Sequence, residues 1–130
     1  MKNAKTILLA ALLAVGIACG YSKKSTTPAV AGTMPNIASL SPSSAPANTM
    51  NVVLTVNGTN FNTNATINWN GTALSTTHVS ANQVIATIPN ADLATSGTAA
   101  VTVTNPGTPG GLYGGGTMAE TSNSMTFTIN

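Results

Sequence analysis

Residues 51–71 read NVVLTVNGTNFNTNATINWNG, and this stretch decides the fold. Its two ends alternate apolar and polar side chains, which is the pattern of strands that bury one face. The side chains predicted to point inward are Val52, Leu54, Val56, Ile67 and Trp69. Between the two strands, we expect Gly58 to end the first one and Phe61 to be buried after the turn. Asn70-Gly71 closes the stretch with the strongest short signal for a hairpin.

The rest of the predicted domain continues as short alternating runs separated by turn residues. The further strands expected are 36–40, 72–75, 77–80, 83–88, 98–105 and 123–129. Their predicted inward side chains are Val84, Ala86, Ile88, Val101, Val103, Met125, Phe127 and Ile129. We expect residues 43–50 to form a turn, since Pro42 and Pro46 do not fit a central strand, and Leu93 to reach the core from a connector. About seven short strands predict an all-β sandwich of immunoglobulin type.

Composition and charge exclude several classes of protein. The chain has 130 residues, enough for one domain, and 5% of them are charged, against about 25% in an ordinary soluble domain. No apolar run reaches the ~18–20 residues that a membrane-spanning helix needs. From Met34 onward there is no Lys or Arg, the residues with which proteins neutralise phosphates. We therefore expect no nucleic-acid partner.

The first residues have the composition of a secretion signal. Lys2 and Lys5 precede an apolar run at 7–17, which has the length of the hydrophobic region of such a signal, and small residues follow it. A buried core helix would be the alternative, but this run has no polar face and no helical partner in a β-rich chain. We therefore predict that residues 1–18 are a signal peptide and that the protein is exported.

Cys19 is the single cysteine and directly follows Gly16-Ile17-Ala18. This arrangement resembles the lipobox of bacterial lipoproteins, in which the chain is cut before the cysteine and its thiol is diacylated. Gly16 stands where the lipobox most often has Leu, and ordinary signal cleavage after Ala18 or Gly20 is the alternative. The resemblance implies a lipid on Cys19 with more than one acyl chain, which gives stable membrane attachment. Gly20, rather than Asp, after the cysteine favours the outer membrane in a Gram-negative cell.

A region without periodicity separates this N-terminus from the alternating runs. It covers residues 19–34 and is rich in Ser, Thr, Pro and Gly, which predicts a flexible tether. The chain thus divides into a signal peptide at 1–18, a tether at 19–34 and a domain at 35–130.

Several short motifs occur in one order along the predicted domain. They are Pro35-x-Ile37-x-x-Leu40-x-Pro42, Leu54-x-Val56-x-Gly58-x-Asn60-Phe61, Val79-Ser80, Ile88-Pro89, Gly97-Thr98-Ala99 and Val101-x-Val103-x-Asn105-Pro106. Together they resemble the IPT/TIG family of immunoglobulin-like domains over residues 35–130. The resemblance implies an early-set immunoglobulin sandwich that serves as a spacer, an interaction surface or a dimerisation unit. The family's DNA-contacting members depend on basic loops, which this chain lacks.

The side chains that carry most enzyme chemistry are scarce. A glycosidase needs two carboxylates flanking one bond, and Asp92 and Glu120 fall in separate connectors. A Ser-His-Asp triad would need His78 and Asp92, and no nucleophile motif accompanies them. Zinc and calcium sites require more ligands than two acids and one His provide. We therefore predict no enzyme activity, no metal site and no cofactor.

Residues 106–122, PGTPGGLYGGGTMAETS, exceed what joining two strands requires. A connection of this length is either functional or disordered. Leu112 and Tyr113 sit at its centre among glycines, where an exposed ring could stack on a sugar or enter a partner's pocket. The alternative is a mobile tip without a binding role. Trp69 is predicted to lie in the core, and if it were exposed it would be the leading carbohydrate platform.

These observations predict a non-catalytic, lipid-anchored cell-envelope protein whose single domain is a binding or scaffold module. We expect it at the outer membrane or cell surface, held by the lipid on Cys19, with an envelope protein or a polysaccharide as its partner. The alternative is an accessory carbohydrate-binding domain that assists a separate polysaccharide-active enzyme.

Overall fold

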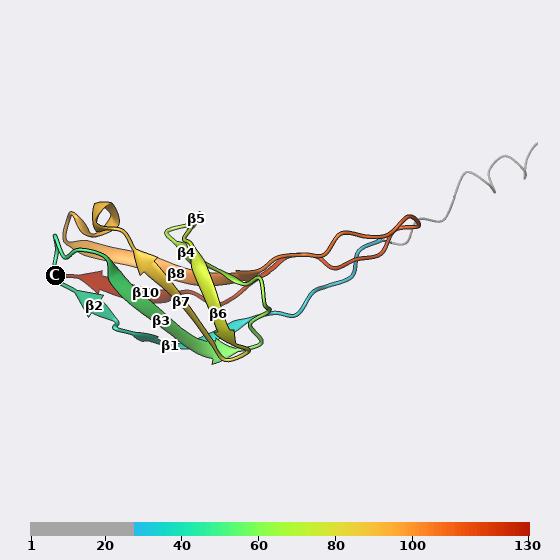
Figure 1. Cartoon of the computed structure of the whole chain (residues 1–130), viewed down its shortest axis with the longest axis horizontal. Coiled ribbons are helices and arrows are strands. Elements are labelled where there is room, and N and C mark those ends of the chain that lie inside the picture. The colour runs from blue at the N-terminus through green and yellow to red at the C-terminus, as the bar shows by residue number, and fades with distance from the viewer. Residues whose placement is uncertain (1–27) are drawn as a thin grey trace, which may run out of the picture.

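The computed structural model describes residues 28–130, which form two β-sheets packed face to face (Figure 1). The four-stranded sheet has the order β1 (Asn36–Ser41), β3 (Val52–Thr59), β7 (Gln83–Ile88), β6 (Thr76–Ser80). The second sheet has the order β2 (Ser44–Ala45), β10 (Met125–Ile129), β8 (Gly97–Asn105), β4 (Thr66–Trp69), β5 (Thr72–Ala73), and β9 (Glu120–Thr121) also pairs with β8. A 3₁₀ helix, η1 (Asn90–Leu93), precedes β8.

The strand order is that of an immunoglobulin-like sandwich. Seven of the described strands have four residues or more, and all sheet neighbours pair antiparallel except β2 with β10. β1, β3, β7 and β6 form one sheet and β10, β8 and β4 the core of the other, which are the two sheets expected for this fold. The predicted all-β, immunoglobulin-like sandwich is confirmed.

The core lies between the sheets and is built by the alternation within the strands. Leu54, Val56 and Ile67 are completely buried, and Trp69 is almost so. The Trp69 and Phe127 rings pack together with their centroids 5.2 Å apart and their planes inclined by 59°. The predicted inward side chains are buried, apart from two that are partly buried and pack against the core, Val52 and Met125. Joining the two apolar faces removes both from water.

Three turn and connector predictions are also confirmed. Asn70 and Gly71 have φ of 49° and 87°, and they form a two-residue hairpin turn between the paired residues Trp69 and Thr72. Phe61 and Leu93 are buried. Leu93 enters the core from η1.

The prediction that Gly58 ends a strand is wrong. β3 continues through Gly58, which pairs with Ile37, and ends at Thr59. A Cβ at Gly58 would collide with the Asn36 carbonyl oxygen and come within 2.7 Å of Phe61 Cζ. Glycine is needed here because the backbone and an aromatic ring approach closely, not because the chain turns.

The predicted turn at residues 43–50 contains a short strand. β2 lies in it between Pro42 and Pro46, and it pairs in parallel with the end of β10. The Asn130 N–H donates to the Ala45 carbonyl at 2.9 Å. β2 is an edge strand of its sheet, and edge strands tolerate nearby prolines because one side of their backbone needs no ladder partner.

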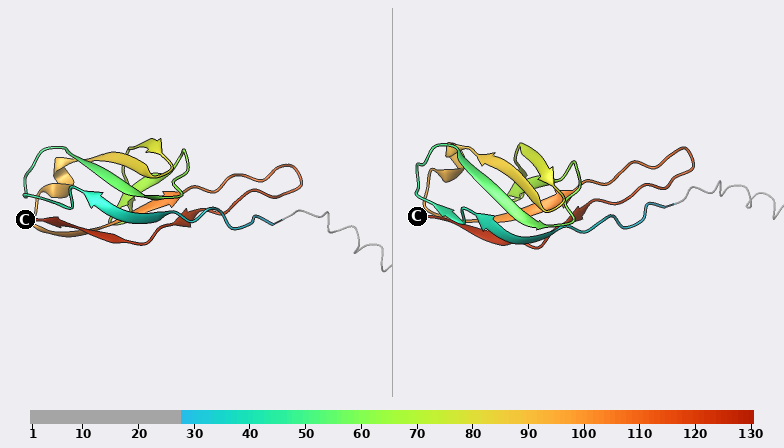
Figure 2. Two further views of the ribbon diagram at one scale, coloured as in Figure 1. Left: turned by 90° about the horizontal axis from the view of Figure 1, so that it is seen from below. Right: turned by 60° about the horizontal axis from the view of Figure 1, so that its bottom comes forward.

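Between β8 and β9 the chain extends away from the sandwich as a narrow projection, residues 106–119, which we call the arm (Figures 1 and 2). Backbone hydrogen bonds join Thr108 and Thr117 in both directions, at 3.0 and 3.1 Å, and Gly111 and Gly114 likewise, at 2.8 and 3.0 Å. The long connection is therefore a hydrogen-bonded β-hairpin.

Residues 28–34, which we call the adjoining segment, run beside the arm (Figure 1). The Val30 N–H donates to the Gly116 carbonyl at 3.1 Å, and the Met118 N–H donates to the Val30 carbonyl at 2.8 Å. Val30 and Thr117 form a parallel bridge. The adjoining segment is thus attached along the arm as a third extended chain.

The predicted N-terminal elements fall mainly outside the described residues. The predicted signal peptide, 1–18, and the predicted lipid site, Cys19, lie outside them. Of the predicted tether, 19–34, the structure describes 28–34, the adjoining segment.

Candidate functional site

The arm is fastened to the sandwich by Asn105, the last residue of β8. This side chain is buried, and its amide group donates to the carbonyls of Thr33 at 2.7 Å and Asn60 at 2.8 Å. Its carbonyl oxygen accepts from the Asn62 N–H at 3.0 Å. One side chain therefore joins the base of the arm, the loop between β3 and β4, and the adjoining segment.

The arm is narrow because its two chains approach closely at several of its glycines. Gly116 has φ of +87°, and a Cβ there would collide with the Thr108 carbonyl oxygen and come within 2.8 Å of the Gly110 nitrogen. At the base, the Glu120 carboxylate accepts a hydrogen bond from the Gly32 N–H at 3.3 Å. Glycine at such positions is therefore required by the close packing of the backbone, and it does not merely make the chain flexible.

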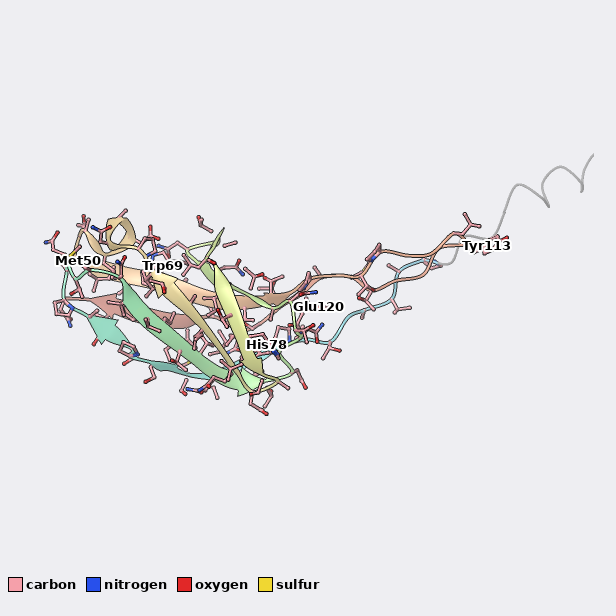
Figure 3. All side chains as sticks on the ribbon, viewed as in Figure 1. Met50, Trp69, His78, Tyr113 and Glu120 are labelled. Atoms are coloured by element: carbon pink, nitrogen blue, oxygen red, sulfur yellow. The ribbon has the colours of Figure 1, made fainter. Side chains whose placement is uncertain are left out.

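The structure brings both sequence-predicted binding residues to the tip of the arm. Leu112 is 87% exposed and Tyr113 is 70% exposed. Tyr113 lies at the end of the arm farthest from the sandwich (Figure 3). The tip therefore presents one aliphatic side chain and one aromatic ring on its exposed surface.

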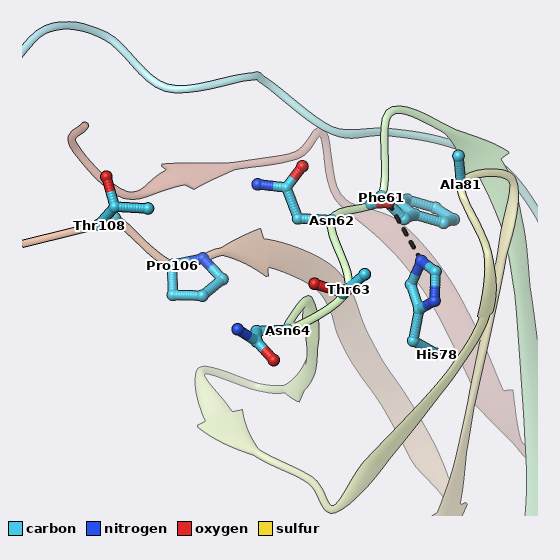
Figure 4. A pocket seen from close by; sticks show the side chains of 9 residues that line it. Phe61, Asn62, Thr63, Asn64, His78, Ala81, Pro106 and Thr108 are labelled. Atoms are coloured by element: carbon cyan, nitrogen blue, oxygen red, sulfur yellow. Dashed lines mark hydrogen bonds between the residues drawn. The ribbon is translucent and has the colours of Figure 1, made fainter. Parts of the chain in front are cut away.

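A hollow of about 440 Å³ lies where the arm meets the sandwich (Figure 4). Residues 61–64 and 106–108 line it together with His78 and Ala81. His78 Nε2 lies 3.2 Å from the Phe61 carbonyl oxygen, so this imidazole is held by the loop rather than free. No single motif predicts this hollow, because its walls come from three segments that are distant in the chain.

The lining of the hollow combines apolar surface with hydrogen-bonding groups. Its walls carry amides and hydroxyls, the Phe61 ring and one imidazole. These groups can donate and accept hydrogen bonds to a small polar ligand. No carboxylate lines it, so His78 has no acidic partner there for acid–base chemistry.

The two acidic side chains of the chain are far apart. Asp92 belongs to η1, at the end of the sandwich near the C-terminus, whereas Glu120 lies at the base of the arm (Figures 1 and 3). Among residues 28–130, no three His, Cys, Asp or Glu side chains gather closely enough to hold a metal ion.

Trp69 does not form a surface platform. It is 4% exposed and packs in the core, as predicted. Among the aromatic side chains of the described residues, Tyr113 is the one that is strongly exposed. Within residues 28–130, a carbohydrate-binding role that relied on an exposed aromatic ring would therefore have to use Tyr113.

The residues that shape the base of the arm are also those of the sequence motifs: Gly58, Asn60, Phe61 and Asn105. In the part of the chain that is described, no helix is long and apolar enough to cross a membrane. Comparison with curated proteins and with solved structures gave no match. Residues 35–129 match the IPT/TIG domain family. Over nearly the whole described chain, then, sequence motifs, sandwich topology and family match agree, and the chain belongs to the IPT/TIG domain family.

Proposed function

We propose that this chain is a non-catalytic, lipid-anchored protein of a bacterial cell envelope whose IPT/TIG domain is a binding or scaffold module. The observation that carries the proposal is the combination of an immunoglobulin-like IPT/TIG sandwich with the N-terminal pattern of Lys2, Lys5, an apolar run and Cys19. The first part supplies a module for interaction, and the second supplies export and attachment.

The distribution of ionisable groups supports a non-catalytic role. Asp92 and Glu120 lie at opposite ends of the sandwich, and His78 binds a backbone carbonyl. Acid–base catalysis needs such groups within hydrogen-bond reach of one reacting bond. The described residues contain no Lys or Arg, so the sandwich has no cationic side chain for binding phosphates.

The anchor can be tested by metabolic labelling of the full chain with radioactive palmitate in a bacterial host. We expect the wild-type chain to incorporate label, and Cys19→Ala to incorporate none, because its only thiol has gone. Globomycin, which blocks the lipoprotein signal peptidase, should cause the uncut precursor to accumulate.

A matched variant separates the position of the thiol from its presence. Ser22→Cys in the Cys19→Ala chain restores one thiol three residues further from the apolar run. We expect no label in this double variant. Label in Cys19→Ala, or a wild-type chain without label, would contradict the proposed anchor.

A further inference from the structure

Exposed apolar surface is concentrated on the arm and the adjoining segment. The large apolar side chains that are exposed among the described residues are Val30, Met34, Met50, Val53, Val79, Leu112, Tyr113 and Met118. Five of these eight belong to the arm or the adjoining segment, and Leu112, at 87%, is the most exposed. Leu112 and Tyr113 adjoin each other at the tip, and adjoining exposed apolar side chains are suited to an interaction surface.

The arm carries no ionised side chain that would oppose contact with a lipid surface. Residues 106–119 contain no Asp, Glu, Lys, Arg or His, so no ionised side chain would lose its water. At the tip, Gly111 and Gly114 exchange two backbone hydrogen bonds, which satisfies polar groups that would otherwise need water.

The adjoining segment runs so that its first residue, Pro28, lies on the side of the tip. Val30 pairs in parallel with Thr117, and the chain after Thr117 runs from the tip to the sandwich. Followed backward from Val30 to Pro28, the chain therefore heads towards the tip (Figure 1). Cys19 is nine residues before Pro28, a span of at most ~30 Å.

We propose that Leu112 and Tyr113 insert into the interfacial layer of the lipid bilayer to which Cys19 attaches the chain, an inference that rests on the proposed lipid anchor. Leu112 enters the boundary of the acyl chains, and Tyr113 keeps its hydroxyl among the headgroups, where tyrosine is enriched in membrane proteins. The tip then forms a second point of attachment beside the lipid. The arm then holds the sandwich away from the bilayer. The end of the sandwich opposite the arm lies farthest from the membrane.

Depth-dependent quenching tests this contact. The full-length Tyr113→Trp chain, purified after expression with lipid modification, is reconstituted into zwitterionic phosphatidylcholine vesicles with or without brominated acyl chains. We expect the emission of the introduced indole to shift to the blue on reconstitution and to be quenched by bromine. Zwitterionic lipid carries no net negative charge, so electrostatic attraction between Lys23 or Lys24 and anionic headgroups does not contribute to binding.

The chain provides its own controls. In the wild-type chain Trp69 is 4% exposed and lies inside the sandwich, so we expect its emission to be unaffected by bromine. Met50→Trp places an indole at the opposite end of the sandwich, where Met50 is 71% exposed against 70% for Tyr113 (Figure 3). We expect no quenching there. Adding Leu112→Asp to Tyr113→Trp should reduce the quenching, because a carboxylate resists entry into the bilayer.

The outcomes separate this inference from the proposed anchor. A palmitate-labelled chain whose introduced indole is neither shifted nor quenched overturns the contact and leaves the anchor standing. Quenching by added vesicles in the Cys19→Ala chain supports the contact, even if labelling has refuted the anchor. A response to envelope polysaccharide but none to vesicles overturns the contact and assigns the tip to carbohydrate.

Discussion

Asn105 shows how a single side chain can organise a junction. Among residues 28–130, Asn105 is the one polar residue that is buried. All three hydrogen bonds of its side chain go to backbone groups of other segments. A buried amide in this position is stable only because each of its polar atoms has a partner. The sequence pattern Val-x-Asn-Pro marks the residue, but its partners can be identified only in the folded chain.

Removing that amide should be costly. We expect Asn105→Ala to lower the free energy of unfolding by about 2–3 kcal/mol, because the Asn62 N–H and the carbonyls of Thr33 and Asn60 lose the side chain that binds them. Urea denaturation measures the effect. Asn64→Ala is the matched control, since Asn64 is exposed, and it should change stability by no more than about 0.5 kcal/mol. Equal effects of the two variants would show that Asn105 does not hold the junction.

Gly58 gives a second prediction at this scale. We expect Gly58→Ala to destabilise the domain by about 1–3 kcal/mol, because the added methyl group meets the Asn36 carbonyl and the Phe61 ring. In Gly111→Ala the nearest atom to the new methyl group is the Gly114 oxygen at 3.9 Å, and we expect almost no change. Thermal unfolding followed by circular dichroism distinguishes them. A tolerated Gly58→Ala would mean that β1 and β3 can separate freely at this point.

The elements of the sandwich were predictable because each strand has one buried face. Alternation alone predicts the bounds of β7 and the inward side chains of β4, and the Asn70-Gly71 pair predicts the turn to β5. The arm has no such signal. Its glycines remove the side chains that would show alternation, so a paired hairpin and an unstructured loop have the same sequence pattern.

The arm should be separable from the stability of the sandwich. Thr108 and Thr117 face each other in an antiparallel bridge, as Trp69 and Thr72 do across Asn70-Gly71. Replacing residues 109–116 by Asn-Gly should therefore close the hairpin early and leave the core intact. We expect the free energy of unfolding to change by less than about 1 kcal/mol, because these residues contribute nothing to the core. Chemical denaturation tests this, and a loss as large as that of Asn105→Ala would make the arm part of the folded core.

At the scale of the whole molecule, the sequence predicts features that depend on one continuous segment. It does not predict contacts between segments that are far apart in the chain. The immunoglobulin-like sandwich and the exposure of Leu112 and Tyr113 follow from local patterns. The hollow beside His78 and the course of the adjoining segment along the arm depend on contacts between segments far apart in the chain. Such contacts depend on three-dimensional register, which residue periodicity does not encode.

The parallel course of the adjoining segment has a mechanical consequence. Its hydrogen bonds to Gly116 and Met118, the bond from Asn105 to Thr33, and the bond from the Ile37 N–H to the Asn123 side chain follow one another along the same stretch of chain. If the proposed lipid on Cys19 holds the chain from its N-terminal side, drag on the sandwich pulls along this stretch, and these bonds are loaded in shear and share the force. A force directed across the segment would break these hydrogen bonds one after another. A force directed along the segment has to break several of them at once.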